Sequence, residues 1–182
     1  MDNNEKKTIN ITGQSNRYQI KKLTQEKKGD KKRIEIEKLN LPIEYFTFEK
    51  QIEIISNILN NDEDKNALKI LINQIEKKIT SYKQQDIDKK KLNNEKIINL
   101  KCIIDKLIET EIKCYYCKTE MYILYENVRD LKQWSVDRIN NDLGHNIDNF
   151  VLACLDCNLK RRCKSSDKFL FTKQLNIIKQ DN

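Results

Sequence analysis

Two pairs of cysteines have the spacing of a metal-binding knuckle. Cys114 and Cys117 lie in the segment CYYC, and Cys154 and Cys157 lie in CLDC. Two intervening residues let both sulfurs of a pair converge from one tight turn, and two such pairs complete a tetrahedral zinc site. Redox-active or unrelated thiols are the alternative, and two pairs in one short segment argue against both. We therefore expect a structural Zn²⁺ held by four cysteines, which would stabilise a segment too short for a large core.

Polar residues with potential chemistry lie between and just after these pairs. The segment WSVDRI, 134–139, is expected to be a strand with Asp137 at its end. The turn-rich segment NNDLGHNIDN follows at 140–149, and FVLA, 150–153, is expected to be the returning strand. CNLKRR then begins a helix with Asn158 in its first turn. The predicted order is strand, loop, strand and helix.

This arrangement resembles the HNH endonucleases, which are also called ββα-metal nucleases. The shared features are a first C-x-x-C, Asp137, Asn149 just before the second strand, and a second C-x-x-C that continues into Asn158 and Arg161. The resemblance covers about residues 112–165, roughly a third of the chain. The fuller string also looks like HNH-type proteins that are common in large eukaryotic DNA viruses.

The resemblance implies a metal-dependent endonuclease. Asp137 and Asn158 would hold one divalent cation between the strand and the helix, and that cation would stabilise charge on the phosphate. Hard oxygen ligands suit Mg²⁺ or Mn²⁺ better than zinc. Asn149 matches the residue that orients the general base in this family.

The chain departs from the family pattern at the base itself. The family usually has a histidine directly after the Asp, whereas this chain has Arg138, which stays protonated and cannot accept a proton from water. Arg138 could still hold the scissile phosphate. The single histidine of the chain, His145, lies in the loop of the same hairpin and titrates near neutral pH. We expect this loop to fold back over the strand end and His145 to replace the missing base; a structural role or no role is the alternative.

Three basic residues follow the expected cation ligand. Lys160, Arg161 and Arg162 lie at a helix start, where they would meet DNA phosphates. A solvated basic face is the alternative. Double-stranded DNA is the expected partner.

The preceding part of the chain has the apolar periodicity of helices. Helices are expected from residue 44 to residue 110, with a break and cap at 61–64, a charged loop at 83–91, and Asn93 or Asn94 capping the third helix. Cys102 falls within the apolar pattern of that helix. MYILY, 121–125, is expected to be a short strand, and a last helix is expected at 168–178. These elements predict an α+β fold, with an N-terminal helical region followed by a small zinc-stabilised ββα-metal module.

Composition sets the domain limits and the compartment. The net charge is +7, and the excess lies mostly in residues 1–35, so 1–40 is expected to be a basic, disordered tail. Residues 41–110 form the expected helical domain and 111–182 the HNH-like module. An apolar span or signal peptide is lacking, so we expect an intracellular, reducing compartment such as cytoplasm or nucleus, or a host cell if the protein is viral.

Three functions fit the sequence. The first is a DNA endonuclease, with no membrane partner and no small organic cofactor. The second is a catalytically inactive, zinc-stabilised module that binds nucleic acid on an HNH scaffold, and Arg138 favours it. The third is a zinc-bearing adaptor that binds proteins. The joint presence of Asp137, His145, Asn149 and Asn158 favours the first, since a scaffold that only binds needs none of them. The sequence does not specify an oligomeric state.

Overall fold

The computed structural model describes residues 12–14, 16–17, 20–21, 31–39, 41–57 and 65–175. The chain divides into two compact units, residues 1–31 and 32–182. In the first unit the described residues include helical turns, in which the Arg17 amide donates to the Gly13 carbonyl at 3.1 Å. The rest of the predicted tail up to residue 30, and the predicted cap at 61–64, lie outside the described residues.

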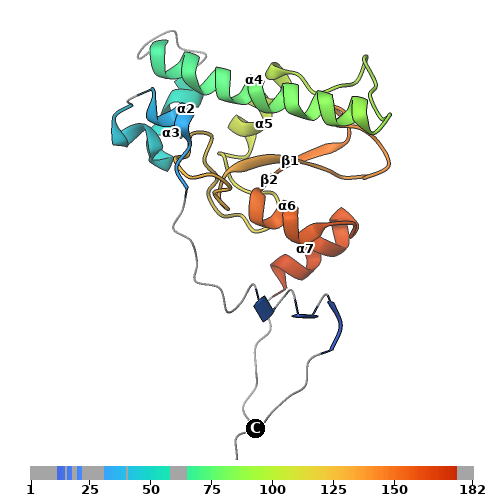
Figure 1. Ribbon diagram of the computed structural model, residues 1–182. Coiled ribbons are helices and arrows are strands. Elements are labelled where there is room, and N and C mark those ends of the chain that lie inside the picture. The colour runs from blue at the N-terminus through green and yellow to red at the C-terminus, as the bar shows by residue number, and fades with distance from the viewer. Residues whose placement is uncertain are drawn as a thin grey trace, which may run out of the picture. The chain divides into compact units, whose positions relative to one another are not determined.

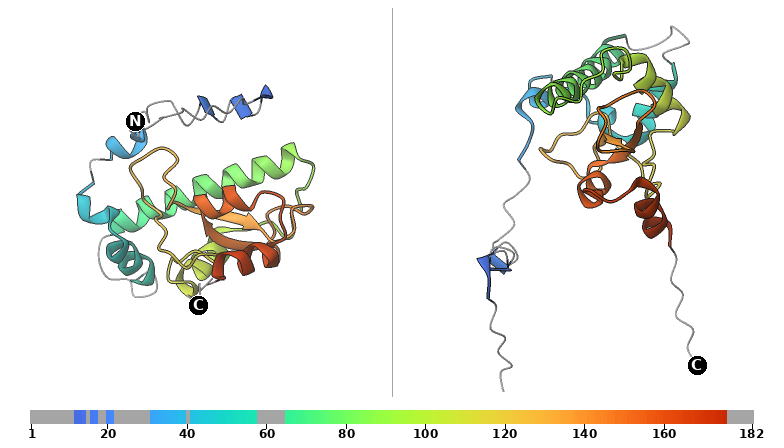
Figure 2. Two further views of the ribbon diagram at one scale, coloured as in Figure 1. Left: turned by 90° about the horizontal axis from the view of Figure 1, so that it is seen from below. Right: turned by 90° about the vertical axis from the view of Figure 1, so that its right-hand side faces the viewer.

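The second unit combines helices with one small sheet, which confirms the α+β class. Figures 1 and 2 show α3, α4 and α5 on one side of the two strands and α6 and α7 on the other. Within the described ranges, every helix is too short or too polar to cross a bilayer. In chain order the elements are α2 (Ile34–Glu37), the 3-10 helix η1 (Ile43–Phe46), α3 (Phe48–Ser56), α4 (Lys65–Asp88), α5 (Leu100–Glu109), β1 (Trp134–Arg138), β2 (Phe150–Cys154), α6 (Leu155–Arg161) and α7 (Ser166–Gln174).

The hairpin and the helix after it form where the sequence predicts them. Strands β1 and β2 pair antiparallel, with Trp134 opposite Cys154 and Arg138 opposite Phe150. The chain passes from β2 directly into α6, whose N-cap is Cys154. Asp137 therefore lies near the end of β1, beside the helix that carries Asn158.

Three local predictions were wrong. Helix α4 continues to Asp88, so most of the expected loop at 83–91 is helical. The cap of α5 is Asn99, whose side chain accepts from the Cys102 amide at 3.0 Å. Residues 121–125 form no strand, although Tyr122 makes an isolated parallel bridge to Gln133. Helix α4 persists because its inward face continues beyond Ile79 through Tyr82 to Asp86, which is buried.

The predicted tail also ends earlier than expected. Residues 32–39 belong to the second unit, where Ile36 of α2 is buried. The Arg33 guanidinium lies 4.3 Å from the centre of the Tyr125 ring and donates to Gln74 Oε1 of α4 at 2.9 Å. These contacts attach the segment around α2 to the helical face.

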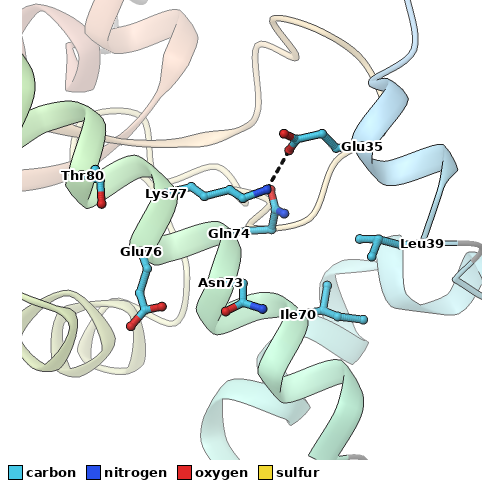
Figure 3. A pocket seen from close by; sticks show the side chains of 8 residues that line it. All are labelled: Glu35, Leu39, Ile70, Asn73, Gln74, Glu76, Lys77 and Thr80. Atoms are coloured by element: carbon cyan, nitrogen blue, oxygen red, sulfur yellow. Dashed lines mark hydrogen bonds and ion pairs between the residues drawn. The ribbon is translucent and has the colours of Figure 1, made fainter.

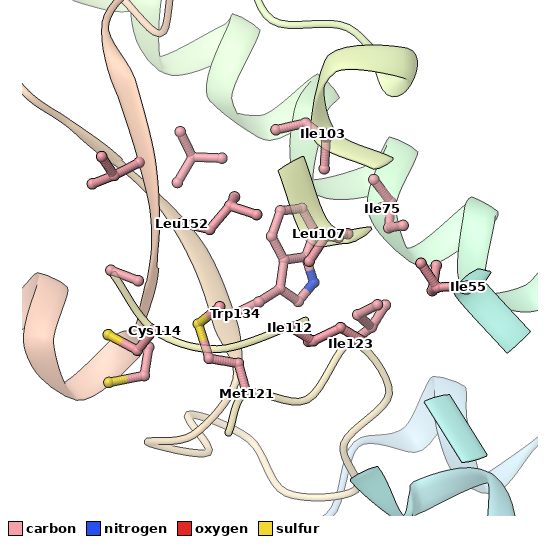
Figure 4. Packing of buried hydrophobic residues seen from close by; sticks show 14 of the residues in the cluster. Ile55, Ile75, Ile103, Leu107, Ile112, Cys114, Met121, Ile123, Trp134 and Leu152 are labelled. Atoms are coloured by element: carbon pink, nitrogen blue, oxygen red, sulfur yellow. The ribbon is translucent and has the colours of Figure 1, made fainter. Parts of the chain in front are cut away.

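The core joins the helical region to the hairpin. Trp134 of β1 is fully buried and lies among residues of α4, α5 and the segment after α5 (Figure 4). The labelled neighbours in that cluster include Ile75, Ile103, Leu107, Ile112, Met121 and Leu152. The boundary predicted near residue 110 therefore does not separate two compact units, because one apolar core spans it.

Helix α4 also covers the free edge of β1. The Val136 amide donates to the Tyr82 hydroxyl at 3.0 Å, and the Lys78 ammonium donates to the Trp134 carbonyl. Unpaired edge groups would otherwise be open to other strands or to water. These two side chains fix the distance between α4 and the end of the hairpin.

A buried glutamine of α3 ties down the segment that follows the first cysteine pair. Gln51 is fully buried, and its Nε2 donates to the carbonyls of Tyr45 and Leu124, both at 3.0 Å. Its Oε1 accepts from the amides of Ile123 and Leu124. The Gln51 side chain thus supplies backbone hydrogen bonds that a neighbouring strand would otherwise supply. They go to Ile123 and Leu124, which lie in the segment expected to be a strand.

Truncation of this side chain should destabilise the second unit strongly. Gln51→Ala leaves several buried backbone groups without partners, each of which costs about 1–3 kcal/mol, so we expect a loss of about 3–5 kcal/mol. Urea unfolding followed by circular dichroism measures it. Glu53→Ala on the exposed side of the same helix should change the stability by about 0.5 kcal/mol or less. Equal effects of the two variants would refute the role given to Gln51.

Candidate active site and cysteine cluster

Four cysteines converge at one end of the hairpin. Cys114 and Cys117 lie in the turn after α5, and Cys154 and Cys157 lie at the junction of β2 and α6. All four sulfurs are within 4.8 Å of one another, and three of the residues are buried. The predicted four-cysteine cluster is therefore formed, and it could hold a metal ion such as zinc. Cys102 and Cys163 lie outside it.

The thiols of this cluster strongly affect one another. Hydrogen bonding with Cys154 lowers the pKa of Cys114 to about 5, and the same interaction with burial raises the pKa of Cys154. Burial, followed by the charge on Cys114, raises the pKa of Cys157 to about 12. Four thiolates at this separation repel one another, so full ionisation needs a cation at their centre.

Asn149 shapes the loop between the strands. Its Oδ1 accepts from the Asn140 amide at 2.8 Å, and its Nδ2 donates to the carbonyls of Asn140 and Gly144, both at 3.0 Å. The side chain is buried. Asn149 thus acts on the residue before His145, and it bonds to the loop backbone instead of the imidazole ring.

The loop places His145 against the last turn of α4. His145 Nδ1 lies 2.8 Å from Asp86 Oδ1, and the His145 amide donates to Asp86 Oδ2 at 2.6 Å. The Tyr82 ring packs against the imidazole with 4.7 Å between ring centres. Both residues of the pair are buried: His145 is 4% exposed and Asp86 is 1% exposed. The loop was expected to fold back over the end of the first strand, and the observed contacts of His145 are instead with helix α4.

This pairing defines the state of the imidazole. An ionised carboxylate only accepts hydrogen bonds, so Nδ1 carries the hydrogen and Nε2 of the neutral ring keeps a free lone pair. Burial lowers the pKa of His145 below its ordinary value of 6.5, although Asp86 acts in the opposite direction. Arg138 and Lys89 lower that pKa further. A neutral imidazole with a free Nε2 is what a general base requires at pH 7.

Asp86 is the residue of the candidate site that was not predicted from the sequence. It lies in a run of charged residues read as a loop. The available signal was the spacing of Leu71, Ile75, Tyr82 and Asp86, which continues one helical face through the polar run. A carboxylate on the buried face of a helix needs a partner, and the only histidine of the chain was available.

Gly144 permits the close contact between loop and helix. A Cβ at this position would lie 2.5 Å from the Lys91 carbonyl oxygen and 2.8 Å from Asp86 Oδ2. Both distances are far below van der Waals contact, and the first involves backbone. Any larger residue would therefore push the loop away from Asp86.

A cavity of 370 Å³ opens beside this pair. The cavity is lined by residues of α4, β1, the hairpin loop and the end of α6. Of the predicted site residues it brings together Asp137, Arg138, His145, Asn158, Arg161 and Arg162. Asn149 and Lys160 are not among its lining residues, and Lys160 pairs instead with Asp156 at 2.7 Å on the surface. Lys89 adds a further positive charge to the wall.

Arg161 differs from its expected position on the surface. Its side chain is 1% exposed, and its Nη2 donates to Asp137 Oδ1 at 2.7 Å. Its Nε lies 2.5 Å from Asp137 Oδ2 in an ion-pair contact whose angle does not make a hydrogen bond. The Tyr116 hydroxyl donates to the same Oδ2 at 2.7 Å. Arg161 is therefore a buried partner of Asp137. The prediction that it would face DNA phosphates was wrong.

Asn158 is held at the base of the cavity. Its Nδ2 donates to Ser135 Oγ at 3.0 Å and to the Val136 carbonyl at 3.2 Å. Arg138 Nη1 donates to the Leu143 carbonyl at 3.0 Å, and Arg162 is exposed. Arg138 and Arg162 leave donors for a phosphate, whereas Arg161 is occupied by the protein.

The positions assigned to a divalent cation do not fit one in this arrangement. The Asp137 carboxylate already contacts the Arg161 guanidinium through both oxygens. A doubly charged ion about 4 Å from that guanidinium would be repelled by roughly 8 kcal/mol at an effective dielectric constant of about 20. Mg²⁺ also demands near-ideal octahedral oxygen ligands, which this carboxylate cannot offer while it is paired.

A second cavity, of 440 Å³, lies between α2 and α4 (Figure 3). Glu35 and Lys77 form an ion pair of 3.0 Å across it, and both side chains are largely exposed. Its other labelled side chains are amides, a hydroxyl, a carboxylate and two aliphatic groups. Its charged groups are exposed, and the buried polar side chain in its wall is Gln74, whose Oε1 is already bonded to Arg33.

Comparison with known proteins gives one partial similarity. No protein-family model matches the chain, and no solved structure matches it. Uncharacterized protein R423 of Acanthamoeba polyphaga mimivirus is 35% identical over 66 residues, which is 36% of this chain and 11% of that protein. The chain thus spans about a tenth of that relative's length, and the similarity concerns one segment of each protein.

Substitution of Gly144 should detach His145 from Asp86. In Gly144→Ala the new methyl group collides with the Lys91 carbonyl, so we expect a loss of stability of about 1–3 kcal/mol. The His145 amide should also lose its protection from hydrogen exchange, since its acceptor is Asp86. Leu143→Ala, at an exposed neighbouring side chain, should leave both quantities nearly unchanged. Retained protection in Gly144→Ala would contradict the described contact.

Proposed function

We propose that this protein is a DNA endonuclease that hydrolyses phosphodiester bonds at the cavity beside His145, on an HNH-like scaffold. The observation that carries the proposal is the Asp86–His145 pair, which presents a neutral imidazole to a cavity with a basic wall. The second strand, the helix after it and the four-cysteine cluster support the HNH-like assignment by their order along the chain.

The proposed division of labour follows from the contacts. Asp86 holds His145 in one tautomer, and His145 Nε2 accepts a proton from the attacking water. Arg138 and Arg162 bind the phosphate, because their guanidinium groups line the cavity and keep donors available. Tyr82 and Gly144 position the imidazole and do not touch the substrate.

A zinc ion in the cysteine cluster is part of the same proposal. It would be held by Cys114, Cys117, Cys154 and Cys157, and it would fix the junction of β2 and α6. That junction carries Asn158 and Arg161 toward the cavity. The ion is therefore structural in this account, and it takes no part in the reaction.

An inactive nucleic-acid-binding module is the second candidate. The observation that favours it is the ion pair between Asp137 and Arg161, which occupies the carboxylate that a metal-dependent nuclease would use. This candidate predicts salt-sensitive DNA binding through the basic wall without cleavage.

Loss of one cysteine of the cluster should remove the zinc. Structural zinc contributes on the order of 10 kcal/mol to the folding of small zinc modules. Cys157→Ser should therefore lower the zinc content, measured by mass spectrometry, and unfold the part of the chain around the hairpin. Cys163→Ser, an exposed cysteine outside the cluster, should retain zinc and fold normally. Wild-type protein purified without bound zinc, yet fully folded, would contradict this assignment.

The nuclease proposal is tested by nicking of supercoiled plasmid DNA by the full chain. Wild type should nick, and His145→Ala should lower the rate by about 10²–10⁴-fold, because that is the usual contribution of a general base. Asp86→Asn should also be strongly impaired. The new amide NH₂ group is a donor, and it would face the backbone N–H or the Nδ1–H of His145, which are donors as well. Asp88→Asn, at an exposed carboxylate two residues further along α4, is the matched control and should keep its activity.

The pH dependence supplies an independent readout. Because burial lowers the pKa of His145, the midpoint of the acidic limb of the pH–rate profile should lie below 6.5, the ordinary value for histidine. Arg138→Gln removes one of the charges that lower this pKa and should move the acidic limb upward; Asp86, Lys89 and Tyr82 are the other groups that face the ring. No nicking by wild type under any condition, with DNA binding retained, would favour the inactive module. Unchanged activity of His145→Ala would show that His145 is not the base.

A further inference from the structure

A buried guanidinium lies where a metal-dependent nuclease of this kind would hold its cation. Arg161 belongs to the last turn of α6 and points to the end of β1 beneath the cavity. Its side chain is almost fully buried, although it is a charged group, so its surroundings must compensate the charge. Those surroundings consist of oxygen atoms.

Five oxygens from four residues surround this guanidinium. Besides the two carboxylate oxygens of Asp137, Nη2 donates to the Arg138 carbonyl at 2.6 Å and to Asn141 Oδ1 at 2.8 Å. Nη1 donates to the Lys164 carbonyl at 2.6 Å. A carboxylate, backbone carbonyls and a side-chain amide oxygen are the ligand types that bind hard cations. We call this set the Arg161 oxygen site.

Resting on the nuclease function proposed above, we propose that Arg161 is a tethered replacement for the divalent cation and that DNA hydrolysis in this cavity needs no Mg²⁺ or Mn²⁺. The guanidinium neutralises Asp137 permanently, so that this carboxylate does not repel the phosphate. Arg161 is a positioning residue in this proposal, because it is 1% exposed and its Nη1 and Nη2 hydrogen bonds go to the Arg161 oxygen site.

The charge of the phosphate is then balanced by the open guanidinium groups. Arg138 has donors beyond its bond to the Leu143 carbonyl, and Arg162 is exposed at the rim. Guanidinium groups remain charged at any physiological pH and can bind two phosphate oxygens at once. They can therefore stabilise charge on the phosphorane without a metal ion.

The reaction balances without a co-reactant other than water. The oxygen of a water molecule forms a bond to phosphorus while its proton passes to His145 Nε2. The bond between phosphorus and the leaving oxygen breaks, and that oxygen takes a proton from solvent. The imidazolium then releases its proton to solvent, which regenerates the neutral base.

The activity experiment uses the zinc-loaded chain of residues 1–182 in buffer cleared of Mg²⁺ and Mn²⁺ by a chelating resin. Zinc content is checked by mass spectrometry, so that loss of the structural ion cannot imitate loss of a catalytic one. We expect plasmid nicking at the same rate with and without millimolar Mg²⁺ or Mn²⁺. Nicking that requires either ion would overturn this inference and leave the nuclease function standing. No nicking under both conditions would instead remove the nuclease function.

Manganese binding tests the Arg161 oxygen site without relying on activity. Wild type should leave the electron paramagnetic resonance signal of free Mn²⁺ undiminished, because the guanidinium fills the site. Arg161→Gln frees Asp137 and should create a Mn²⁺ site, whereas Lys160→Gln, which removes the same charge from the same helix, should not. Binding of Mn²⁺ by wild type that disappears in Asp137→Asn would refute the inference, and this outcome does not depend on how well Arg161→Gln folds.

Discussion

One buried carboxylate holds the candidate site together. Asp86 accepts hydrogen bonds from both the backbone and the ring of His145, and thereby attaches the hairpin loop to the end of α4. A buried carboxylate without a partner would destabilise the fold. Asp86 of the helix therefore needs the donors of His145, and the His145 loop needs Asp86 as its acceptor. Gly144 makes the contact sterically possible, and Asn149 shapes the loop that delivers it. The cavity exists only because the helical region and the hairpin meet here.

The second constraint is the charge of Arg161 beneath the same cavity. A buried guanidinium and a buried carboxylate compensate each other, and the remaining donors go to oxygens of the loop and of the chain after α6. The end of β1 is thereby joined to α6 and to the hairpin loop. The same pair alters the chemistry that the scaffold can perform, because Asp137 is no longer available to a divalent ion. In the proposed function, His145 and Arg161 are two departures from the HNH pattern. The base would come from a different position, and the Arg161 side chain would take the place of the cation.

Features encoded by local spacing were predictable from the sequence. The two cysteine pairs, the hairpin with Asp137 near the end of β1, and the helix that carries Asn158 each depend on residues a few positions apart. The His145 loop was expected to fold back over the end of the first strand, and its contact with α4 was not expected. The partner of His145 was not predicted, because Asp86 is 59 positions away and lies in a charged run whose helical phase is hard to see. The burial of Arg161 was missed for a related reason: adjacent basic residues look alike in sequence, and only the register of α6 separates the inward one from its neighbours. The capping of α5 by Asn99 and the role of Gln51 likewise depend on tertiary contacts or on single hydrogen bonds.

The most direct test of this account is nitrogen NMR of the His145 imidazole in the intact protein. The chain has one histidine, so its ring signals need no assignment strategy. We expect a neutral ring at pH 7 with the hydrogen on Nδ1, an unprotonated Nε2, and a pKa below 6.5. Asp86→Asn should abolish the single tautomer, whereas Asp88→Asn should preserve it. A ring that exchanges between both tautomers in the wild type, or that titrates at or above 6.5, would contradict the role of Asp86 in preparing His145 as a base.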